Sequence, residues 1–366
     1  MKAPGKTLAV ALASLLAGAA VLPSVAAACT RAVYNGSDGT VITGRNMDWM
    51  QDMQTDLWAF PAGMERNGNA GEGSATWTSK YGSVIASSYN LASADGMNEK
   101  GLVANLLYLS QADYGDDDAN PSMTVGLWGQ YVLDNYATVD EVVKGFAEHP
   151  IHIVAPALPN GSAATIHLSV SDPTGDSAIF EYLGGKLQVH HGKQYNIMTN
   201  SPPFDQQLAL NGYWQNIKDA FLPGTNSAAD RFVRASYLMD AVKKSTDPNF
   251  IQDVQGQSYA RQAVAQTLSV MRSVSVPIGI TTPGEPNIAS TLWRTAADQK
   301  NLIYFFDSAT MPNTFWVDLK QLDLSAGAPA KKLAIAGGHD YSGETSSDFV
   351  EAKPFTFMTA DPSASK

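Results

Sequence analysis

The sequence predicts an α+β fold of four layers, in which two stacked antiparallel sheets lie between outer helices. Segments typical of strands and helices follow one another in five groups: strands, helices, strands, helices and strands. Short glycine-containing turns join strands within a group, and such hairpins pair strands antiparallel. Helices on the outer faces would cover surfaces that the two sheets cannot leave in water. A single sheet with helices on one face is the alternative.

The first strand group is a hairpin. Residues 30–35 and 40–47 are typical of β-strands, and a Gly-Ser-Asp-Gly turn separates them. A hairpin returns the chain to its starting point. It would therefore bring Arg45 and Asp48 close to Cys29.

The later elements continue the alternation. Strand segments are expected over 83–110 around a tight turn at 95–101, and helices over 122–148. Thr138 followed by Glu141 is a capping box, so two helices are expected to meet there. The remaining predicted elements are a meander of four strands (164–171, 177–183, 186–191 and 195–200), two helices (228–245 and 258–273) and three closing strands (288–294, 302–307 and 313–319).

Composition and charge exclude several classes of function. The chain has 366 residues, of which 44% are hydrophobic and 16% are charged, as in a folded globular protein. Its formal net charge of −11 argues against nucleic acid, which needs a basic surface, and against docking onto anionic lipid. We therefore expect a small-molecule substrate and no nucleic-acid partner.

Residues 1–28 are typical of a secretory signal peptide. Two early lysines, an apolar run over 8–21 and three alanines at 26–28 follow one another in the order of such a segment. The run is too short to span a bilayer comfortably, although an uncleaved membrane anchor is the alternative. Cleavage would leave residues 29–366 as one periplasmic or secreted domain without stable membrane contact.

The chain has one cysteine, Cys29, directly after the alanine triplet. Cleavage before it would join a thiol nucleophile to an α-amino base in one residue, the amine having an ordinary pKa of about 7.7–8.0. In a lipoprotein the thiol would instead carry lipid, although Ala26 stands where a lipidation box usually has Leu or Val. A buried structural cysteine is the third alternative.

Five segments share the order and spacing of motifs in one enzyme family. They are Cys29-Thr30-Arg31, Gly44–Trp49, Ala94–Leu102, Met198–Asp205, and Leu222-Pro223-Gly224 followed by Asp230–Arg234. Together with a cysteine at a signal junction, the set resembles the choloylglycine hydrolase family. This family includes bile salt hydrolases and penicillin V acylases, and it belongs to the N-terminal nucleophile hydrolases. The resemblance implies their αββα sandwich and catalysis by Cys29.

The resemblance also implies roles for further residues. Cys29 would be the nucleophile, and Arg45 beside the thiol would favour the thiolate. Asp48 would accept hydrogen bonds from the α-amino group and orient it. Asn200 would donate its side-chain amide to the oxyanion of the tetrahedral intermediate. Arg231 would stabilise charge at the thiolate or the intermediate.

Tyr108 is the position expected to vary with the substrate. Its backbone N–H would be the second oxyanion donor, and the family tends to carry Asn here in bile salt hydrolases but Tyr in penicillin V acylases. An aromatic side chain suits a flat or aryl acyl group, although a tyrosine packed in the core is the alternative. Arg234 is the nearest rival to Arg231 for the role of the second arginine.

The expected activity is hydrolysis of a linear amide through a Cys29 thioester, without metal or cofactor. The signal peptide resembles the exported branch of the family in bacteria with two membranes, which points to penicillin V or to N-acyl homoserine lactones, the latter a quorum-quenching activity. Conjugated bile salts are the alternative substrates, and a lipid-anchored, non-catalytic binding protein is the alternative of another class. Homo-oligomerisation stays open, because the segment between Asn200 and Arg231 is shorter than the one that helps bile salt hydrolases form tetramers.

Overall fold

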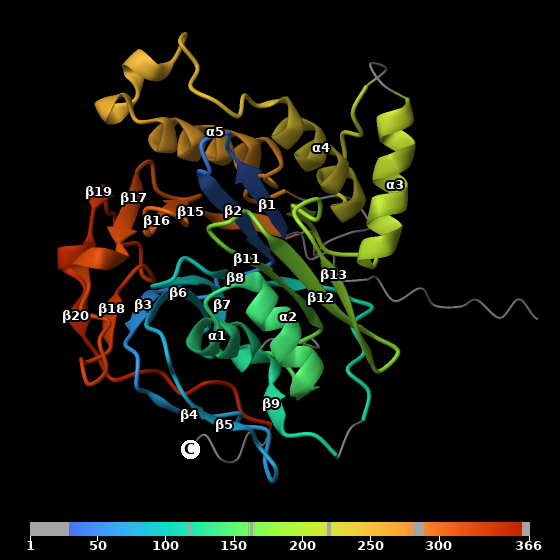
Figure 1. Ribbon diagram of the computed structural model, residues 1–366, viewed down its shortest axis with the longest axis vertical. Coiled ribbons are helices and arrows are strands. Elements are labelled where there is room, and N and C mark those ends of the chain that lie inside the picture. Colours follow the sequence, from blue (N-terminus) through green and yellow to red (C-terminus); the bar gives the residue numbers. More distant parts are fainter. Residues whose placement is uncertain are drawn as a thin grey trace, which may run out of the picture.

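The computed structural model describes residues 29–116, 119–159, 161, 164–217, 221–280 and 289–360. Two large sheets lie face to face, and helices cover the outer face of each (Figure 1). The four-layer αββα arrangement confirms the predicted fold class. The predicted signal peptide, residues 1–28, lies outside the described residues.

The first sheet has seven strands in the order β14-β1-β2-β15-β16-β17-β19. Neighbouring strands pair antiparallel, except for β17 and β19, which are parallel. The strands are β1 (Thr30–Asn35), β2 (Val41–Trp49), β14 (Ile197–Met198), β15 (Ser290–Asp298), β16 (Ile303–Ser308), β17 (Thr314–Asp318) and β19 (Gly343–Glu344). The hairpin predicted directly after Cys29 therefore lies in the interior of this sheet, between β14 and β15.

The second sheet has nine antiparallel strands in the order β13-β12-β11-β8-β7-β6-β3-β18-β20. They are β3 (Leu57–Phe60), β6 (Ser83–Ser88), β7 (Ala92–Asn98), β8 (Val103–Tyr108), β11 (Ile166–Ser171), β12 (Ser177–Leu183), β13 (Lys186–His191), β18 (Lys331–Leu333) and β20 (Val350–Glu351). Two small sheets lie at the periphery: β4 (Glu65–Asn67) with β5 (Thr76–Thr78), and β9 (Ser122–Thr124) with β10 (His152–Val154).

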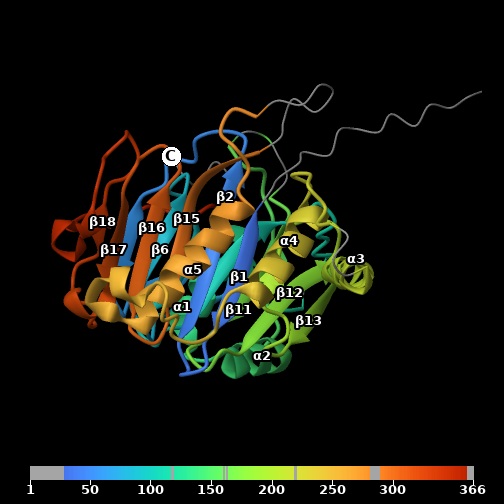
Figure 2. The same cartoon turned by 90° about the horizontal axis from the view of Figure 1, so that it is seen from above.

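Helices α4 and α5 cover the seven-stranded sheet, whereas α1 and α2 cover the nine-stranded sheet (Figures 1 and 2). The helices are α1 (Val125–Asn135), α2 (Val139–Glu148), α3 (Phe204–Asn216), α4 (Ala228–Ala241) and α5 (Tyr259–Ser273), with short 3₁₀ turns η1 (Ile251–Asp253), η2 (Gln255–Gln257), η3 (Leu319–Gln321) and η4 (Ser346–Asp348). The predicted helix boundary is confirmed, because Thr138 Oγ1 accepts the Glu141 N–H at 3.2 Å. Within the described residues, no helix is long and apolar enough to cross a membrane.

The tight turn predicted at 95–101 is wrong in extent. Strand β7 continues to Asn98, and the chain turns only at 99–102. Gly96 serves packing rather than turning: a Cβ atom there would lie 2.6 Å from Ile85 Cγ2 and 3.0 Å from Leu133 Cδ1 of α1. Gly101, with φ +80°, supplies the left-handed conformation that the turn needs.

The predicted four-strand meander is also wrong in its last member. Ile197 and Met198 pair with β1 in the other sheet and not with β13. This crossing carries Asn200 from one sheet to the start of β1, beside Cys29. The sequence also failed to predict α3, because only Phe204 and Gln207 of this helix are buried and it has no apolar stripe. In 122–148, residues 122–124 form β9 and precede the first helix.

Strand β2 is buried along its whole length. One face of it packs in the core between the two sheets, and α5 covers the other. Gly44 allows α5 to approach closely, since a Cβ atom there would lie 2.7 Å from Thr267 Cγ2 and 2.8 Å from Met271 Cγ. Polar side chains on β2 are therefore withdrawn from bulk solvent, which strengthens their electrostatic interactions.

Candidate active site

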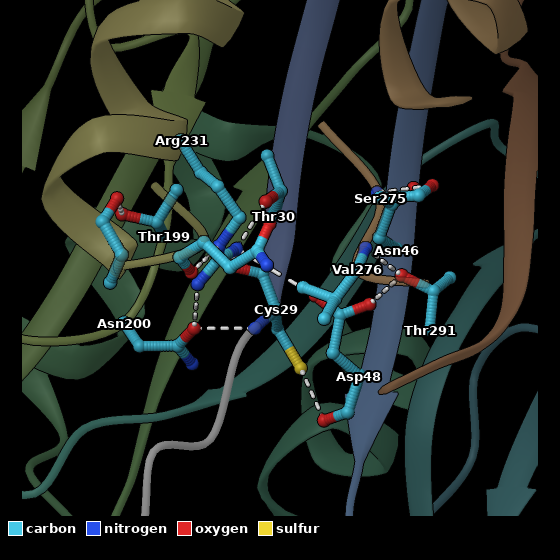
Figure 3. Close-up of polar contacts among 12 residues, drawn as sticks. Cys29, Thr30, Asn46, Asp48, Thr199, Asn200, Arg231, Ser275, Val276 and Thr291 are labelled. Atoms are coloured by element: carbon cyan, nitrogen blue, oxygen red, sulfur yellow. Dashed lines mark hydrogen bonds and ion pairs between the residues drawn. The ribbon is translucent and has the colours of Figure 1, made fainter. Parts of the chain in front are cut away.

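Cys29 directly precedes β1 and lies beside the end of β2 (Figure 3). The β1–β2 register pairs Thr30 with Asn46, so Met47 and Asp48 come next to Cys29. Its side chain is buried, and Sγ lies 3.7 Å from the carbonyl oxygen of Asp48. The predicted hairpin thus brings Asp48 to the cysteine.

Arg45 presents a buried cation to the thiol. Its Nη2 atom lies 3.9 Å from Cys29 Sγ and donates to the carbonyl oxygen of Leu106 at 2.8 Å. The guanidinium also packs over the ring of Trp293, 4.9 Å from its centroid, a favourable cation–π geometry. No carboxylate forms a salt bridge with Arg45 among the residues described, so the nearby thiol is exposed to its positive charge.

Burial and charge act on the thiol in opposite directions. Desolvation is the largest influence and raises the pKa of Cys29, while the charge of Arg45 lowers it by less. The net result for the full chain is a raised pKa, so here the thiol is protonated at neutral pH. The thiolate-favouring effect expected of Arg45 is therefore present but outweighed by burial.

The side-chain amide of Asn200 connects three groups of the site. Its Oδ1 accepts hydrogen bonds from the Cys29 nitrogen and, at 3.0 Å, from Arg231 Nη2 (Figure 3). Its Nδ2 donates to the carbonyl oxygen of Tyr108 at 2.7 Å. The reverse orientation would set the Asn200 donors against other donors, so the network determines which amide atom is which.

The Cys29 nitrogen is a peptide nitrogen in the full chain, and it occupies the place that an α-amino group would take after cleavage. The family resemblance implies Asp48 as the hydrogen-bond acceptor of this nitrogen, but in the structure the acceptor is Asn200 Oδ1. The Asp48 carboxylate is bound instead by the hydroxyl of Thr291 at Oδ1, and Oδ2 lies 3.7 Å from Arg231 Nη1.

Asp48 is a buried carboxyl group. Burial raises its pKa to about 6, against the opposing effect of the Arg231 charge and the Thr291 hydrogen bond. Its Oδ2 atom has no hydrogen-bond partner among the described residues. An ammonium group at the start of a cleaved chain would add a donor and a positive charge on this side of the site.

Arg231 lies in the first turn of α4, where the Ser227 side chain caps the helix by accepting the Asp230 N–H. Its Nη1 donates to the carbonyl oxygen of Cys29 at 2.6 Å and to Thr30 Oγ1 at 2.5 Å. Arg234, the rival candidate, donates to backbone carbonyl groups outside the site. The structure therefore places Arg231, and not Arg234, beside the cysteine.

The backbone of Tyr108 faces the same site. The Leu109 N–H donates to Thr165, so Leu109 belongs to a hydrogen-bonded pair with β11 and the neighbouring Tyr108 belongs to a non-hydrogen-bonded pair. The N–H and C=O groups of Tyr108 therefore point away from β11. The β7–β8 ladder ends at Asn105, and beyond it the Tyr108 carbonyl oxygen accepts a hydrogen bond from Asn200 Nδ2.

A small pocket of about 60 Å³ lies against the thiol. Trp49 and Tyr108 form part of its wall, with ring centroids 6.2 Å apart and planes inclined by 57°. Apart from Cys29, Arg45 and Ser88, the other lining residues are non-polar: Met47, Met53, Ala92, Ala94, Leu106, Leu107, Val125, Gly126, Leu158, Ile166 and Met358. Such a wall suits an apolar or aromatic substituent bound next to the sulfur atom.

Comparison with known proteins identifies the family. Residues 29–334 match the family described as linear amide C–N hydrolases, choloylglycine hydrolase family. The chain belongs to this family. The hydrolase is 46% identical over 368 aligned positions to a penicillin V acylase of Pectobacterium atrosepticum, with 95% of this chain and 96% of that protein covered. It is 28% identical to a bile salt hydrolase/transferase of Clostridium perfringens, with 59% of this chain and 73% of the relative covered.

Solved structures agree with this assignment. The structure of a penicillin V acylase from Agrobacterium tumefaciens has a TM-score of 0.81 and 50% sequence identity, and covers 90% of this hydrolase and all of that chain. A conjugated bile acid hydrolase of Clostridium perfringens has a TM-score of 0.69 at 23% identity, covers 86% and 98% of the two chains, and supports the fold alone. The chain is an amidohydrolase that acts on linear amides.

The sequence did not point to two partners of the site in this hydrolase. Thr291 holds the Asp48 carboxylate, and Trp293 packs on the guanidinium of Arg45. Both lie on β15, which pairs with β2. The sequence predicts a strand over these two residues, but which strand it pairs with depends on the tertiary structure. Among the described residues, no group of three or more His, Cys, Asp or Glu side chains is arranged to hold a metal ion.

Proposed function

We propose that this amidohydrolase cleaves the side-chain amide of penicillin V or of a related N-acyl compound, with Cys29 as an N-terminal nucleophile. The observation that carries the proposal is that Cys29 lines a largely apolar pocket, with Arg45 beside its sulfur atom and Asn200 bound to its nitrogen. The similarity to penicillin V acylases over most of the chain supports the substrate class.

Activation begins with removal of the signal peptide before Cys29, in export to the periplasm or the medium. Cleavage turns the buried peptide nitrogen of Cys29 into an α-amino group that keeps Asn200 Oδ1 as its hydrogen-bond acceptor. The unperturbed pKa of such a group is about 7.7–8.0, so it takes up the thiol proton near neutral pH. The ammonium ion then adds to the positive charge of Arg45 and favours the thiolate.

The thiolate attacks the amide carbonyl carbon, and a negative charge develops on the carbonyl oxygen. Two donors are available for this oxyanion: the backbone N–H of Tyr108 and the second N–H of Asn200 Nδ2, whose first N–H binds the Tyr108 carbonyl oxygen. Arg231 keeps the Asn200 amide in this orientation through Oδ1. These groups are oriented before substrate binds, so little reorganisation accompanies the reaction.

Collapse of the tetrahedral intermediate breaks the C–N bond. The Cys29 ammonium group gives its proton to the leaving nitrogen, and the acyl group stays on sulfur as a thioester. Water then attacks the thioester, with the free α-amine accepting its proton. The carboxylic acid leaves and the thiol is restored, so each turnover consumes one water molecule.

The Trp49–Tyr108 wall favours a flat aryl acyl group, such as the phenoxyacetyl group of penicillin V. The remaining aliphatic lining would also accept the alkyl chain of an N-acyl homoserine lactone. Hydrolysis of that substrate would make the protein a quorum-quenching enzyme. Glycocholate represents the bile salt hydrolase alternative.

The test is amine release by the purified, processed protein from penicillin V, a long-chain N-acyl homoserine lactone and glycocholate in parallel. We expect the highest kcat/KM with penicillin V, and no release by Cys29→Ala with an unchanged circular dichroism spectrum. Preference for glycocholate would contradict the acyl assignment, and activity of Cys29→Ala would contradict the mechanism. Mass spectrometry of the N-terminus should find unmodified Cys29, whereas a diacylglyceryl group there would support the lipid-anchored alternative.

A further inference from the structure

Tyr89 does not line the pocket, yet its phenol oxygen holds one of the pocket walls. The Trp49 indole donates from Nε1 to Tyr89 Oη at 2.8 Å, and Gln51 Nε2 donates to the same oxygen at 2.8 Å. Trp49 is buried and lines the pocket together with Cys29. An indole N–H can only donate, so Tyr89 Oη supplies the acceptor that the buried Trp49 N–H needs.

The backbone holds Tyr89 in a conformation that bulky residues rarely adopt. Ser88 to Leu91 form a turn, closed by the Leu91 N–H donating to the Ser88 carbonyl oxygen at 2.9 Å. Its central residues, Tyr89 and Asn90, have φ values of 54° and 47°. Positive φ at both central positions normally selects Asn or Gly. A tyrosine in this conformation is strained, and the hydrogen bond that it accepts from Trp49 is a functional explanation for its presence.

The hydrogen bond fixes the orientation of the indole. With Nε1 directed at Tyr89 Oη, the Trp49 ring keeps its 57° inclination and 6.2 Å centroid distance to Tyr108. These two rings form the aromatic part of the wall near the thiol. Without the acceptor, the indole N–H would have to rotate toward another partner, and the wall would change shape.

We propose that Tyr89 is a positioning residue that sets acyl selectivity by holding the Trp49 indole in place. The inference rests on the proposed function, because it concerns which acyl group reaches Cys29. Tyr89 acts through Trp49 and touches neither the substrate nor the reacting atoms. It favours flat aryl acyl groups, which need a wall of fixed inclination, over flexible alkyl chains, which adapt to the available space.

The same turn offers a matched control. Asn90 Oδ1 accepts the indole N–H of a different tryptophan, Trp58, at 2.9 Å. Trp58 packs against Phe60 and Phe355 and does not line the pocket. Asn90→Gly suits the positive φ and removes a tryptophan hydrogen bond from the turn, but it leaves the bond to Trp49 in place.

The first experiment compares kcat/KM for an aryl-acyl and an alkyl-acyl amide in wild type, Tyr89→Phe and Asn90→Gly. In Tyr89→Phe we expect the aryl-to-alkyl ratio to fall about tenfold, mainly through a higher KM for the aryl substrate. Asn90→Gly should keep the wild-type ratio. Tyr89→Asn, which suits the left-handed backbone, should lower the ratio as Tyr89→Phe does. An unchanged ratio in both Tyr89 variants, or an equal loss for both substrates, would overturn the proposal.

A second readout does not depend on amide hydrolysis. Cys29 is the only cysteine, so the mass increase after treatment with an N-phenyl or N-hexyl haloacetamide reports alkylation at this thiol. We expect wild type and Asn90→Gly to prefer the phenyl reagent and Tyr89→Phe to lose that preference. If none of the amides is hydrolysed but this shift is observed, the proposed substrates are wrong and the role of Tyr89 stands. Equal phenyl preference in wild type and Tyr89→Phe would overturn it.

Discussion

Arg231 Nη2 donates to Asn200 Oδ1 across 3.0 Å, and both side chains are buried. The same Oδ1 accepts a hydrogen bond from the Cys29 nitrogen. Rotation of the Asn200 amide would therefore break the charge-assisted hydrogen bond from Arg231. Its Nδ2 is consequently directed at the Tyr108 backbone. An arginine from α4 thus determines the direction of an amide from the segment after β14.

Asn200→Ala should lower kcat by about 10²–10³, corresponding to about 3–4 kcal/mol of transition-state stabilisation, as for loss of one oxyanion donor. KM should change little, because the donor binds charge that develops only in the transition state. Steady-state kinetics with a chromogenic anilide of the preferred acid would measure both constants. A rise in KM with normal kcat would assign Asn200 to ground-state binding instead.

Arg231→Gln should lose at least as much activity as Asn200→Ala, because it frees the amide and removes a charge beside Cys29 and Asp48. Arg234→Gln is the matched control one helical turn later. Among the described residues Arg234 donates to the Pro223 and Thr225 carbonyl groups, so this variant should retain most activity. Parallel measurement of kcat and of the thermal unfolding midpoint separates loss of function from loss of fold. Comparable kcat in the two variants would remove Arg231 from the catalytic machinery.

The Asp48 carboxyl group should make stability depend on pH. Its pKa is raised from 3.8 to about 6, so between these values the folded chain binds a proton that the unfolded chain has lost. Relative to Asp48→Asn, the unprocessed wild type, whose Cys29 nitrogen is uncharged, should therefore lose up to about 3 kcal/mol of unfolding free energy as pH rises from about 4 to about 6. Urea denaturation of both proteins across this range gives the difference. If the wild type gains relative stability over this interval, the ion pair with Arg231 outweighs burial.

Gly44→Ala should destabilise the fold by about 1–3 kcal/mol, because the new Cβ would overlap Thr267 and Met271 and force α5 away from β2. At Gly212, within α3, an added Cβ atom would have no described atom within 4 Å, so Gly212→Ala should be neutral or stabilise by up to about 1 kcal/mol. Chemical denaturation monitored by tryptophan fluorescence measures both changes. Equal stability of the two variants would show that α5 adjusts freely at Gly44.

Local sequence was sufficient for the elements whose signals are local. The hairpin after Cys29 follows from a glycine-containing turn between two strand segments, and its register places Arg45 and Asp48 at the thiol. The capping box at Thr138 marks a real helix boundary. The motif 94–102 was recognised as a unit, but its glycines do different things: Gly96 makes room for α1 and Gly101 turns the chain. Sequence alone could not separate these uses, since both need the absence of a Cβ atom.

The residue types of the site follow from the sequence, because motif order and spacing point to a cysteine, two arginines, an aspartate and an asparagine. Their mutual directions were decided only in the tertiary structure. Residues 197–198 pair with β1 in the seven-stranded sheet, which brings Asn200 to the Cys29 nitrogen. Asn200, and not Asp48 as expected, is therefore the hydrogen-bond acceptor of this nitrogen. Hydrogen bonds and burial depend on groups far apart in the chain. The hydrogen bond between Trp49 and Tyr89, 40 residues apart, therefore could not be predicted from a local sequence pattern.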